Sequence, residues 1–339
     1  MTRKDVALLA NVSETTVSVV LNGSKDVIIA RDTRQRVQEA AKQLGYRPNY
    51  AARTIKSKKS RTLGMLSPWK PEVWFFADIL NGVRQAASEN GYGILLCNML
   101  EKEKGPNDCI RYFREGRIDG VIYLPPHTTE LPGLSDLADE GIPTVLCNGV
   151  SPYGQMDGLV IDYASGIYEA AKYLHEAGFS RLLYIQPDAD AQLIPGDIDR
   201  IRGFDAAADL PGVTLQKEIF SLQAIGSIEG RMKKAEEIIR RLEGPTGIIA
   251  CYWNQAYYLE TKAAILKLDT ERDLKVIAGD CPEFVGSLYP RIVGIDLPFF
   301  EIGHLAGVRI ISRLEGEADQ ETSNVLKGRQ LFRGGDGAR

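Results

Sequence analysis

Hydrophobic positions in the first 46 residues recur with helical spacing in three short segments. Thr2 and Asp5 have the spacing of a capping box that begins a helix, and Gly45 is a typical helix end. The pattern predicts helices over about 2–10, 14–22 and 31–44, the first two joined by a tight turn, as in a helix-turn-helix. The positions expected to face inward are Val6, Leu9, Ala10, Val17, Val20, Leu21, Val37, Ala40, Ala41 and Leu44.

From Thr62 onward, short apolar runs alternate with amphipathic stretches of helical length. Examples are "TLGMLSP", "YGILLCN", "DGVIYLPP" and "IPTVLCNG", and later "RLLYIQP", "GIIACY" and "DLKVIAGD". This alternation predicts parallel sheets with helices on both faces, in two doubly wound lobes. Ligands of such lobes bind at the carboxyl ends of the strands, so we expect a binding cleft between the lobes.

The outward face of the second helix carries short polar side chains. A helix that enters the DNA major groove needs such side chains to reach phosphates and base edges. The alternative is that the Ser and Thr residues cap and cover a small surface helix, and the helix alone favours neither. The outward candidates are Glu14, Thr15, Thr16, Ser18, Val19 and Asn22.

Charge is divided unevenly along the 339 residues, whose formal net charge is -4. Residues 1–60 contain twelve Lys and Arg against five Asp and Glu, a net of +7, so the remainder carries -11. A basic head on an acidic body suggests a polyanion-binding module attached to a second function. The alternative is a solvated, lysine-rich terminus.

The segments "DVALLANVSETTVSVVLN" and "TRQRVQEAAKQLGYRPNYAARTI" resemble the head of the LacI (lactose-repressor) family of bacterial transcription regulators. The resemblance implies a three-helix head over residues 1–48, and a hinge helix and linker over 49–60 that becomes helical on the operator. Ile55 would enter between base pairs from the minor groove, which costs unstacking and bends the duplex. An ordinary linker hydrophobe is the alternative for Ile55, and Arg53 would follow the phosphates or the narrow groove. The residues expected to contact DNA are Thr2, Ser13, Glu14, Thr15, Thr16, Ser18, Val19, Asn22, Thr33, Tyr46, Asn49, Arg53 and Ile55.

Three positions of the head depart from the family pattern. Val19 stands where an arginine is usual, which removes a bidentate guanine contact worth roughly 1–3 kcal/mol. Glu14 is acidic, so it would accept from a cytosine amino group or repel phosphate. Ala30 replaces the serine that usually caps the third helix. We therefore expect an operator that differs from the family consensus.

The body continues the resemblance through "FFADILNGVRQAASENGYGILLCN", "RIDGVIYLPP", "GIPTVLCN", "RIRGF" and "LPFFEIGHLAGVRIISRLEG". The family's effector domain is similar to periplasmic sugar-binding proteins, which implies one effector-binding and dimerisation domain over 61–339. Its N-lobe would span about 61–160 and 293–322, and its C-lobe about 161–292 and 323–339. The implied crossovers between lobes lie near Val160–Asp162, Arg291–Gly294 and Thr322–Val325.

The resemblance also implies a set of effector-binding residues. Flat rings would stack on a sugar or base, while Arg200, Asp280 and the amides would bind hydroxyls or carbonyls. Phe76 has the alternative of a core position, and Arg200 and Asp280 could pair across a loop. Asn148, Trp253 and Asn254 differ from the commonest family residues, which suggests an effector with fewer hydroxyls or more aromatic character. The full set is Phe75, Phe76, Asn148, Arg200, Trp253, Asn254 and Asp280.

Other classes of function lack their motifs in this sequence. The histidines His127, His175 and His304 share no metal-ligand spacing, and GxSxG, P-loop and CxxC motifs are absent. We therefore expect no enzyme, no cofactor and no metal. The five dispersed cysteines predict buried thiols in a reducing compartment. The start of the chain lacks a secretion signal and no segment has the length of a membrane span, which predicts a soluble cytoplasmic protein.

Together these patterns predict a homodimeric DNA-binding transcription regulator, most simply a repressor. Two heads would bind the half-sites of a pseudo-palindromic operator in double-stranded DNA. A small molecule, expected to be a carbohydrate, would control operator affinity from the cleft between the lobes. One alternative is a solute-binding protein of a transport system, which predicts an export signal and no basic head. Another is a cleft enzyme with an accessory DNA-binding head, which predicts turnover of a substrate.

Overall fold

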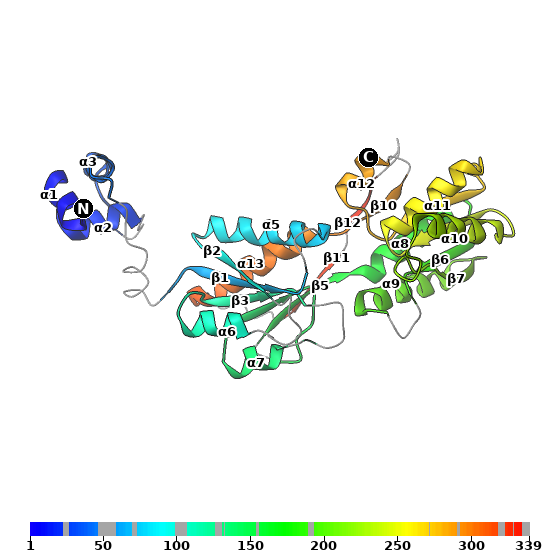
Figure 1. Ribbon diagram of the computed structural model, residues 1–339, viewed down its shortest axis with the longest axis horizontal. Coiled ribbons are helices and arrows are strands. Elements are labelled where there is room, and N and C mark those ends of the chain that lie inside the picture. Colours follow the sequence, from blue (N-terminus) through cyan, green and yellow to red (C-terminus); the bar gives the residue numbers. More distant parts are fainter. Residues whose placement is uncertain are drawn as a thin grey trace. The chain divides into compact units, whose positions relative to one another are not determined.

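The computed structural model describes residues 1–22, 27–46, 59–69, 73–98, 107–125, 131, 133–153, 156–188, 193–270, 272–289, 292–317, 323–327 and 329–333. The chain divides into two compact units, Met1–Ser60, here called the head unit, and Arg61–Arg339, here called the body. Figure 1 colours both along the sequence.

The head unit contains the three predicted helices, α1 (Arg3–Ala10), α2 (Glu14–Asn22) and α3 (Arg31–Gln43). The capping box at the start of α1 is confirmed: the Asp5 backbone N–H donates to Thr2 Oγ1 over 3.3 Å, and the Thr2 N–H donates to Asp5 Oδ2 over 2.7 Å. As the sequence indicated, Ala30 gives α3 no side-chain cap. The core of the unit is formed by Val6, Ala7, Ala10, Val17, Val20, Val37, Ala40 and Ala41.

One predicted core position of the head unit is wrong. Leu9 is 46% exposed, and Ala7 occupies the core in its place. Val6 and Ala10 form the centre of the buried stripe, and Ala7 and Leu9 flank it on opposite sides. The side that faces α2 and α3 is the one with the small alanine, so the stripe could be predicted but not its exact edge.

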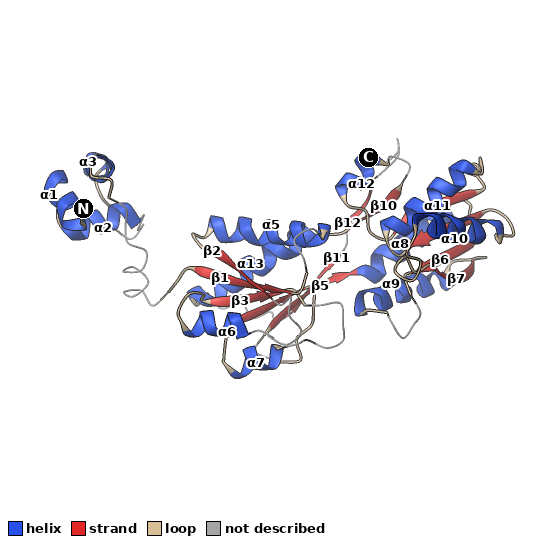
Figure 2. Ribbon diagram, in the orientation of Figure 1, coloured by secondary structure: helices blue, strands red, loops and turns tan. Residues whose placement is uncertain are grey.

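The first lobe of the body is a parallel sheet in the order β11-β5-β4-β3-β1-β2. Helices α5 and α13 cover one face and α6 and α7 the other, with a buried cluster on each side (Figure 2). Its strands are β1 (Thr62–Ser67), β2 (Gly93–Asn98), β3 (Gly120–Tyr123), β4 (Thr144–Cys147), β5 (Asp157–Asp162) and β11 (Ser323–Lys327). Its helices are α5 (Trp74–Glu89), α6 (Asn107–Arg114), α7 (Leu134–Asp139) and α13 (Phe299–Glu315).

The second lobe has the sheet order β12-β10-β9-β8-β6-β7, parallel except for β12, which runs antiparallel to β10. Its strands are β6 (Arg181–Gln186), β7 (Thr214–Ile219), β8 (Thr246–Ala250), β9 (Leu274–Ala278), β10 (Val293–Asp296) and β12 (Arg329–Arg333). Its helices are α8 (Tyr163–Glu176), α9 (Pro195–Asp205), η2 (Ala206–Asp209), α10 (Ile228–Arg240), α11 (Trp253–Ile265) and α12 (Glu283–Leu288).

The chain changes lobe at three places in the described residues. The first follows β5 at Asp162, within the expected range. The second lies between β10 and α13 rather than at Arg291–Gly294, because Val293 and Gly294 pair with β9 of the second sheet. The third lies between β11 and β12 rather than at Thr322–Val325, because Ser323–Lys327 pair with β5 of the first sheet. The lobe boundaries drawn at 293 and 323 are shifted accordingly, to follow β10 and β11.

None of the helices in the described residues is both long and apolar enough to cross a membrane. The five cysteines are buried and free of disulfides.

Candidate functional site

The outer face of α2 mixes exposed polar side chains with residues that stabilise the helix itself. Ser13 caps α2, since its Oγ accepts the backbone N–H of Thr16 over 3.0 Å and lies 2.9 Å from the Thr16 hydroxyl. Thr15 is exposed, and Ser18 and Val19 are half-buried. The capping explanation therefore applies to Ser13 and Thr16. Among Glu14, Thr15, Thr16, Ser18 and Val19, the most exposed side chain is that of Thr15.

Glu14 has a partner that the sequence analysis missed. Its Oε2 lies 3.0 Å from Nε of Arg3 at the start of α1, and both side chains are about half exposed. The helix-turn-helix geometry brings these two residues together, although they lie eleven positions apart. The Arg3 cation beside it offsets part of the charge of Glu14, which reduces the expected repulsion of phosphate by this carboxylate.

Some of the remaining DNA-contact candidates lie within the described residues and others lie outside them. Thr33 Oγ1 accepts from Arg36 Nη2 over 3.4 Å, and Tyr46 packs against the core of the head unit. Asn22 is the last residue of α2. Asn49, Arg53 and Ile55 lie outside the described residues, so the predicted hinge contacts remain predictions.

The body contains a cavity of about 190 Å³ at the carboxyl ends of its strands, as expected for doubly wound lobes. Phe75 and Trp74 begin α5, Trp253 and Asn254 begin α11 after β8, and Asp280 follows β9. Five of the seven expected effector residues line it. The complete lining is Trp69, Trp74, Phe75, Tyr163, Arg200, Tyr252, Trp253, Asn254, Asp280 and Phe299.

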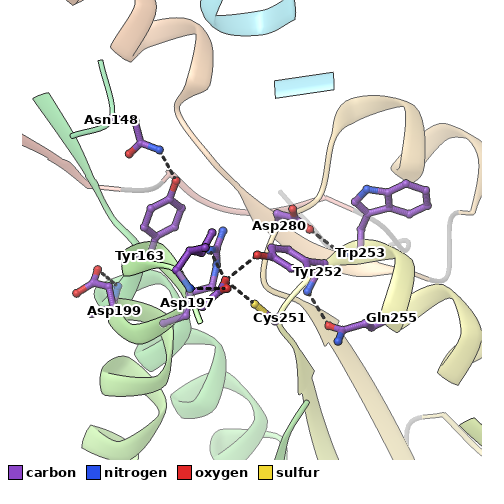
Figure 3. Close-up of polar contacts among 12 residues, drawn as sticks. Asn148, Tyr163, Asp197, Asp199, Cys251, Tyr252, Trp253, Gln255 and Asp280 are labelled. Carbon is purple, nitrogen blue, oxygen red and sulfur yellow. Dashed lines mark hydrogen bonds and ion pairs between the residues drawn. The ribbon is translucent and has the colours of Figure 1, made fainter. Parts of the chain in front are cut away.

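Two expected residues do not line this cavity. Phe76 is 3% exposed and packs in the core beneath α5, because consecutive residues of a helix point about 100° apart. Asn148 supports the cavity indirectly: its Nδ2 donates to the Tyr163 hydroxyl over 2.9 Å (Figure 3). Asn148 therefore orients the ring of Tyr163, which lines the cavity.

Arg200 is the central charged group of the pocket. Its guanidinium carbon lies 4.0 Å from the centre of the Tyr163 ring and 5.5 Å from that of Tyr252, so the cation is held between two aromatic rings. Nη1 lies 3.5 Å from Asp197 Oδ1, and both side chains are about 5% exposed. Among the described residues, Arg200 Nε has no hydrogen-bond partner.

Asn254 has an unpaired acceptor, where Arg200 has an unpaired donor. Its Oδ1 is buried and has no partner among the described residues. Buried polar atoms are almost always paired, so an unpaired donor on Arg200 and an unpaired acceptor on Asn254, in two residues that line one cavity, set this site apart.

Asp197 contacts residues of this site, and the sequence analysis missed it. Its Oδ1 accepts from the Tyr252 hydroxyl over 2.7 Å and from Cys251 Sγ over 3.4 Å, besides facing Arg200 (Figure 3). Burial raises the pKa of Tyr252 and of Cys251, so both keep their protons and donate. Asp197 therefore fixes the position of Arg200 and of one lining ring.

Asp280 accepts the backbone N–H of Trp253 over 2.6 Å. Burial raises its pKa to about 6, although the nearby Arg200 and the Trp253 N–H both act in the opposite direction. Burial therefore removes more solvation from the Asp280 carboxylate than its neighbours replace. A ligand hydroxyl or amino group that donated a hydrogen bond to it would stabilise the charged form.

The first lobe contributes four aromatic rings to the cavity lining, here called the aromatic wall. The centres of Phe75 and Phe299 are 5.6 Å apart in a stacked arrangement, and Trp74 meets Phe299 edge-on at 5.1 Å. Trp69 contacts Phe75 at 5.0 Å and is fixed by its Nε1, which donates to the Pro125 carbonyl over 3.1 Å. A cyclic ligand with one apolar face and a polar edge matches this pocket.

The raised pKa of Asp280 has a consequence for stability. The folded state keeps this proton up to about pH 6, whereas the unfolded chain loses it near 3.8, so the contribution of Asp280 to stability falls as pH rises from about 4 to 6. We expect Asp280→Asn to remove this slope. The difference in free energy of unfolding between the variant and wild type should therefore shift in favour of the variant by of the order of 1–3 kcal/mol between pH 4 and pH 7. Urea unfolding across that range, for wild type and variant, measures it. Parallel pH profiles for the two proteins would contradict the prediction.

In the part of the chain that the structure describes, no group of three His, Cys, Asp or Glu side chains is placed to hold a metal ion.

The comparisons with known proteins agree with this arrangement. The family model "Bacterial regulatory proteins, lacI family" matches residues 2–49, and "Periplasmic binding proteins and sugar binding domain of LacI family" matches residues 60–257. The HTH-type transcriptional regulator RegA of Clostridium saccharobutylicum is 28% identical over 96% of both chains. The HTH-type transcriptional repressor PurR of Vibrio atlanticus is 28% identical over 93% of this chain and 92% of its own.

Two solved structures share the fold. The lac repressor dimer bound to operator and the anti-inducer ONPF superposes with a TM-score of 0.71 at 18% identity, covering 97% of this chain and 96% of that one. The CelR–cellobiose complex, a transcriptional regulator, gives a TM-score of 0.65 at 22% identity, covering 99% of this chain and all of the other.

Proposed function

The chain belongs to the LacI family of bacterial regulatory proteins, and on that premise we propose that it is a repressor whose operator affinity is set by a small molecule in the aromatic pocket. The observation that carries the proposal is the pairing of a basic helix-turn-helix unit with a pocket that contains two orphaned polar atoms. The relatives named above are transcriptional regulators, in keeping with a DNA-binding regulator rather than an enzyme.

The pocket favours a neutral cyclic effector, such as a sugar or sugar derivative. Aromatic rings stack on the C–H face of such a ring, while the Arg200 guanidinium donates to a hydroxyl and Asp280 accepts from one. Two buried carboxylates, Asp197 and Asp280, outnumber the single guanidinium of Arg200, so an anionic effector would meet excess negative charge. The cavity is smaller than the 300 Å³ or more typical of drug-sized ligands, which favours a single ring.

The DNA-binding half of the proposal includes a homodimer whose two heads meet a pseudo-palindrome. The lac repressor, which has the same fold, was solved as a dimer bound to operator. Selection of bound fragments from a random duplex pool is expected to yield paired half-sites. Binding to them should weaken steeply with salt, because basic side chains displace counterions. A protein that binds every duplex equally, or none at moderate ionic strength, would contradict the proposal.

A variant in the predicted hinge tests the wedge. We expect Ile55→Gly to weaken binding to the selected duplex at least tenfold and to leave non-specific binding unchanged, since the wedge is useful only where the duplex bends. Fluorescence anisotropy with the selected and a scrambled duplex measures both affinities. Equal losses on the two duplexes would mean that position 55 is an ordinary linker residue.

The effector half can be tested through intrinsic fluorescence. The protein has three tryptophans, and Trp69, Trp74 and Trp253 all line the pocket, so its emission reports on that site. Titration with neutral sugars, sugar phosphates and nucleobases should give a saturable change with a neutral ring compound, and Trp253→Ala should reduce the change. A response confined to sugar phosphates would contradict the charge argument.

A further inference from the structure

Helices α5 and α13 lie side by side with their backbones in contact (Figure 1). A Cβ at Gly82 would overlap the carbonyl oxygen of Phe300, and one at Gly307 would come within 2.7 Å of the Ala86 Cβ. Residues that face each other increase in number together along the two helices, from Ile79 and Gly303 to Ala86 and Gly307, so the helices run parallel. Contact this close leaves no room for sliding, and we treat the pair as one rigid element, here called the helix bar.

The helix bar begins at the effector pocket. The first residue of α5 is Trp74 and that of α13 is Phe299, and both rings line the cavity and meet edge-on at 5.1 Å. Phe75 stacks on Phe299 beside them. A ligand that stacks on this wall therefore contacts the first turn of both helices.

The helix bar ends at Arg61, the residue that follows the head unit in the chain. Arg61 Nη1 donates to the carbonyl oxygen of Asn90, the C-cap of α5, over 3.4 Å. Nη2 lies 3.8 Å from Oε1 of Glu315, the last residue of α13, and the guanidinium lies over the Tyr92 ring. The Tyr92 hydroxyl donates to the same Oε1 over 2.7 Å. Arg61, Tyr92 and Glu315 are here called the exit clamp.

The backbone of Arg61 is held as firmly as its side chain. Its N–H donates to Asp119 Oδ2 over 2.7 Å and its carbonyl accepts from Gly93 N–H over 2.8 Å. Its φ is 48°, in the left-handed region that residues other than glycine rarely adopt. Such a conformation persists only where the surroundings impose it, and it often marks a functional position.

We propose that the helix bar transmits the state of the pocket to the start of the body, and that the exit clamp positions the linker that leads to the DNA-binding head. The proposal depends on the proposed function, since it concerns how the same pocket controls the same head. By helical rise, the 17 residues of α13 span about 25 Å. Residues at its two ends do not touch each other, so direct contact cannot couple them.

A double-mutant cycle tests this coupling without a known effector. Phe299→Leu alters the pocket end and Glu315→Gln the clamp end, and the readout is affinity for the duplex that wild type selects from a random pool. Effects of substitutions this far apart normally multiply. We expect the double variant to depart from the product of the single effects by about threefold or more, with little change for a scrambled duplex.

Glu243→Gln is the matched control. It removes the same kind of charge from an exposed ion pair, with Arg181 Nη1 at 2.8 Å, in the second lobe and away from both helices. Its effect should multiply with that of Phe299→Leu. Urea unfolding of each variant separates loss of fold from loss of coupling. If Glu315→Gln unfolds the body, Tyr92→Phe replaces it in the cycle, because it keeps the ring and removes only the hydroxyl.

If the effects of Phe299→Leu and Glu315→Gln on duplex affinity simply multiply, while wild type still selects a duplex, the proposed coupling through the helix bar is wrong and the proposed function stands. Failure of wild type to select any duplex overturns the proposed function itself.

Discussion

Gly303→Ala is expected to destabilise the body by about 3 kcal/mol or more, as measured by urea unfolding at neutral pH. A Cβ at this position would overlap the carbonyl oxygen of Ile79 in α5 and lie 2.9 Å from its carbonyl carbon. These are backbone atoms, which cannot move aside as the end of a side chain can. In a helix interior, alanine is intrinsically better than glycine by about 1 kcal/mol, so the steric cost must exceed that gain.

Gly226→Ala is the matched control for this prediction. No atom lies within 4 Å of the Cβ that it would add, and its φ is not positive in the range that disfavours side chains. We expect it to change the free energy of unfolding by no more than about 0.5 kcal/mol. A Gly303→Ala protein as stable as wild type would show that α5 and α13 can separate freely, and it would also remove the basis of the helix bar.

The sequence predicted those parts of the fold that local periodicity determines. The three helices of the head unit follow from apolar spacing and caps such as Thr2, which act within a few residues. The crossovers at 293 and 323 were misplaced because an apolar run such as "RIVGID" can pair in either sheet. Which sheet it joins depends on strands tens of residues away, and no local pattern reports that choice.

The same distinction holds for the pocket. Arg200 and Asp280 could be predicted from the family pattern, but Asp197 could not, because an aspartate three residues before an arginine resembles an ordinary surface helix pair. Its burial depends on Cys251 and Tyr252, which arrive from another strand. One signal was present for Trp74: like Phe75, it stands in the first helical turn after a strand, where ligands of parallel sheets bind.

Arg200→Met is expected to cost about 3–5 kcal/mol of stability at pH 7.5, because it leaves a buried charge uncompensated. Arg200 lies 3.5 Å from Asp197 Oδ1, and its charge favours the ionised form of Asp280. Both carboxylates are less than a tenth exposed, and water cannot replace the guanidinium. Methionine fills much of the volume, so the loss should reflect charge more than packing.

The pH dependence of stability in Arg200→Met distinguishes loss of charge from loss of packing. Without Arg200, the pKa of Asp280, already about 6, should rise further, because the cation that lowered it is gone. The folded variant then binds a proton that the unfolded chain does not, and its stability increases as pH falls from 7.5 to 5. Wild type binds the same proton only below about pH 6, so the deficit against wild type should shrink by up to about 2 kcal/mol between pH 7.5 and pH 5, as measured by urea unfolding at both values.

Two further variants make the interpretation specific. Arg200→Lys keeps the charge and loses the planar contact with Tyr163, so it should lose less stability than Arg200→Met, and its deficit against wild type should change little with pH. Asp280→Asn combined with Arg200→Met removes one of the two carboxylates and should restore part of the stability at pH 7.5. A deficit of equal size at pH 5 and 7.5 in Arg200→Met would assign the loss to packing against Tyr163 and Tyr252 instead of charge.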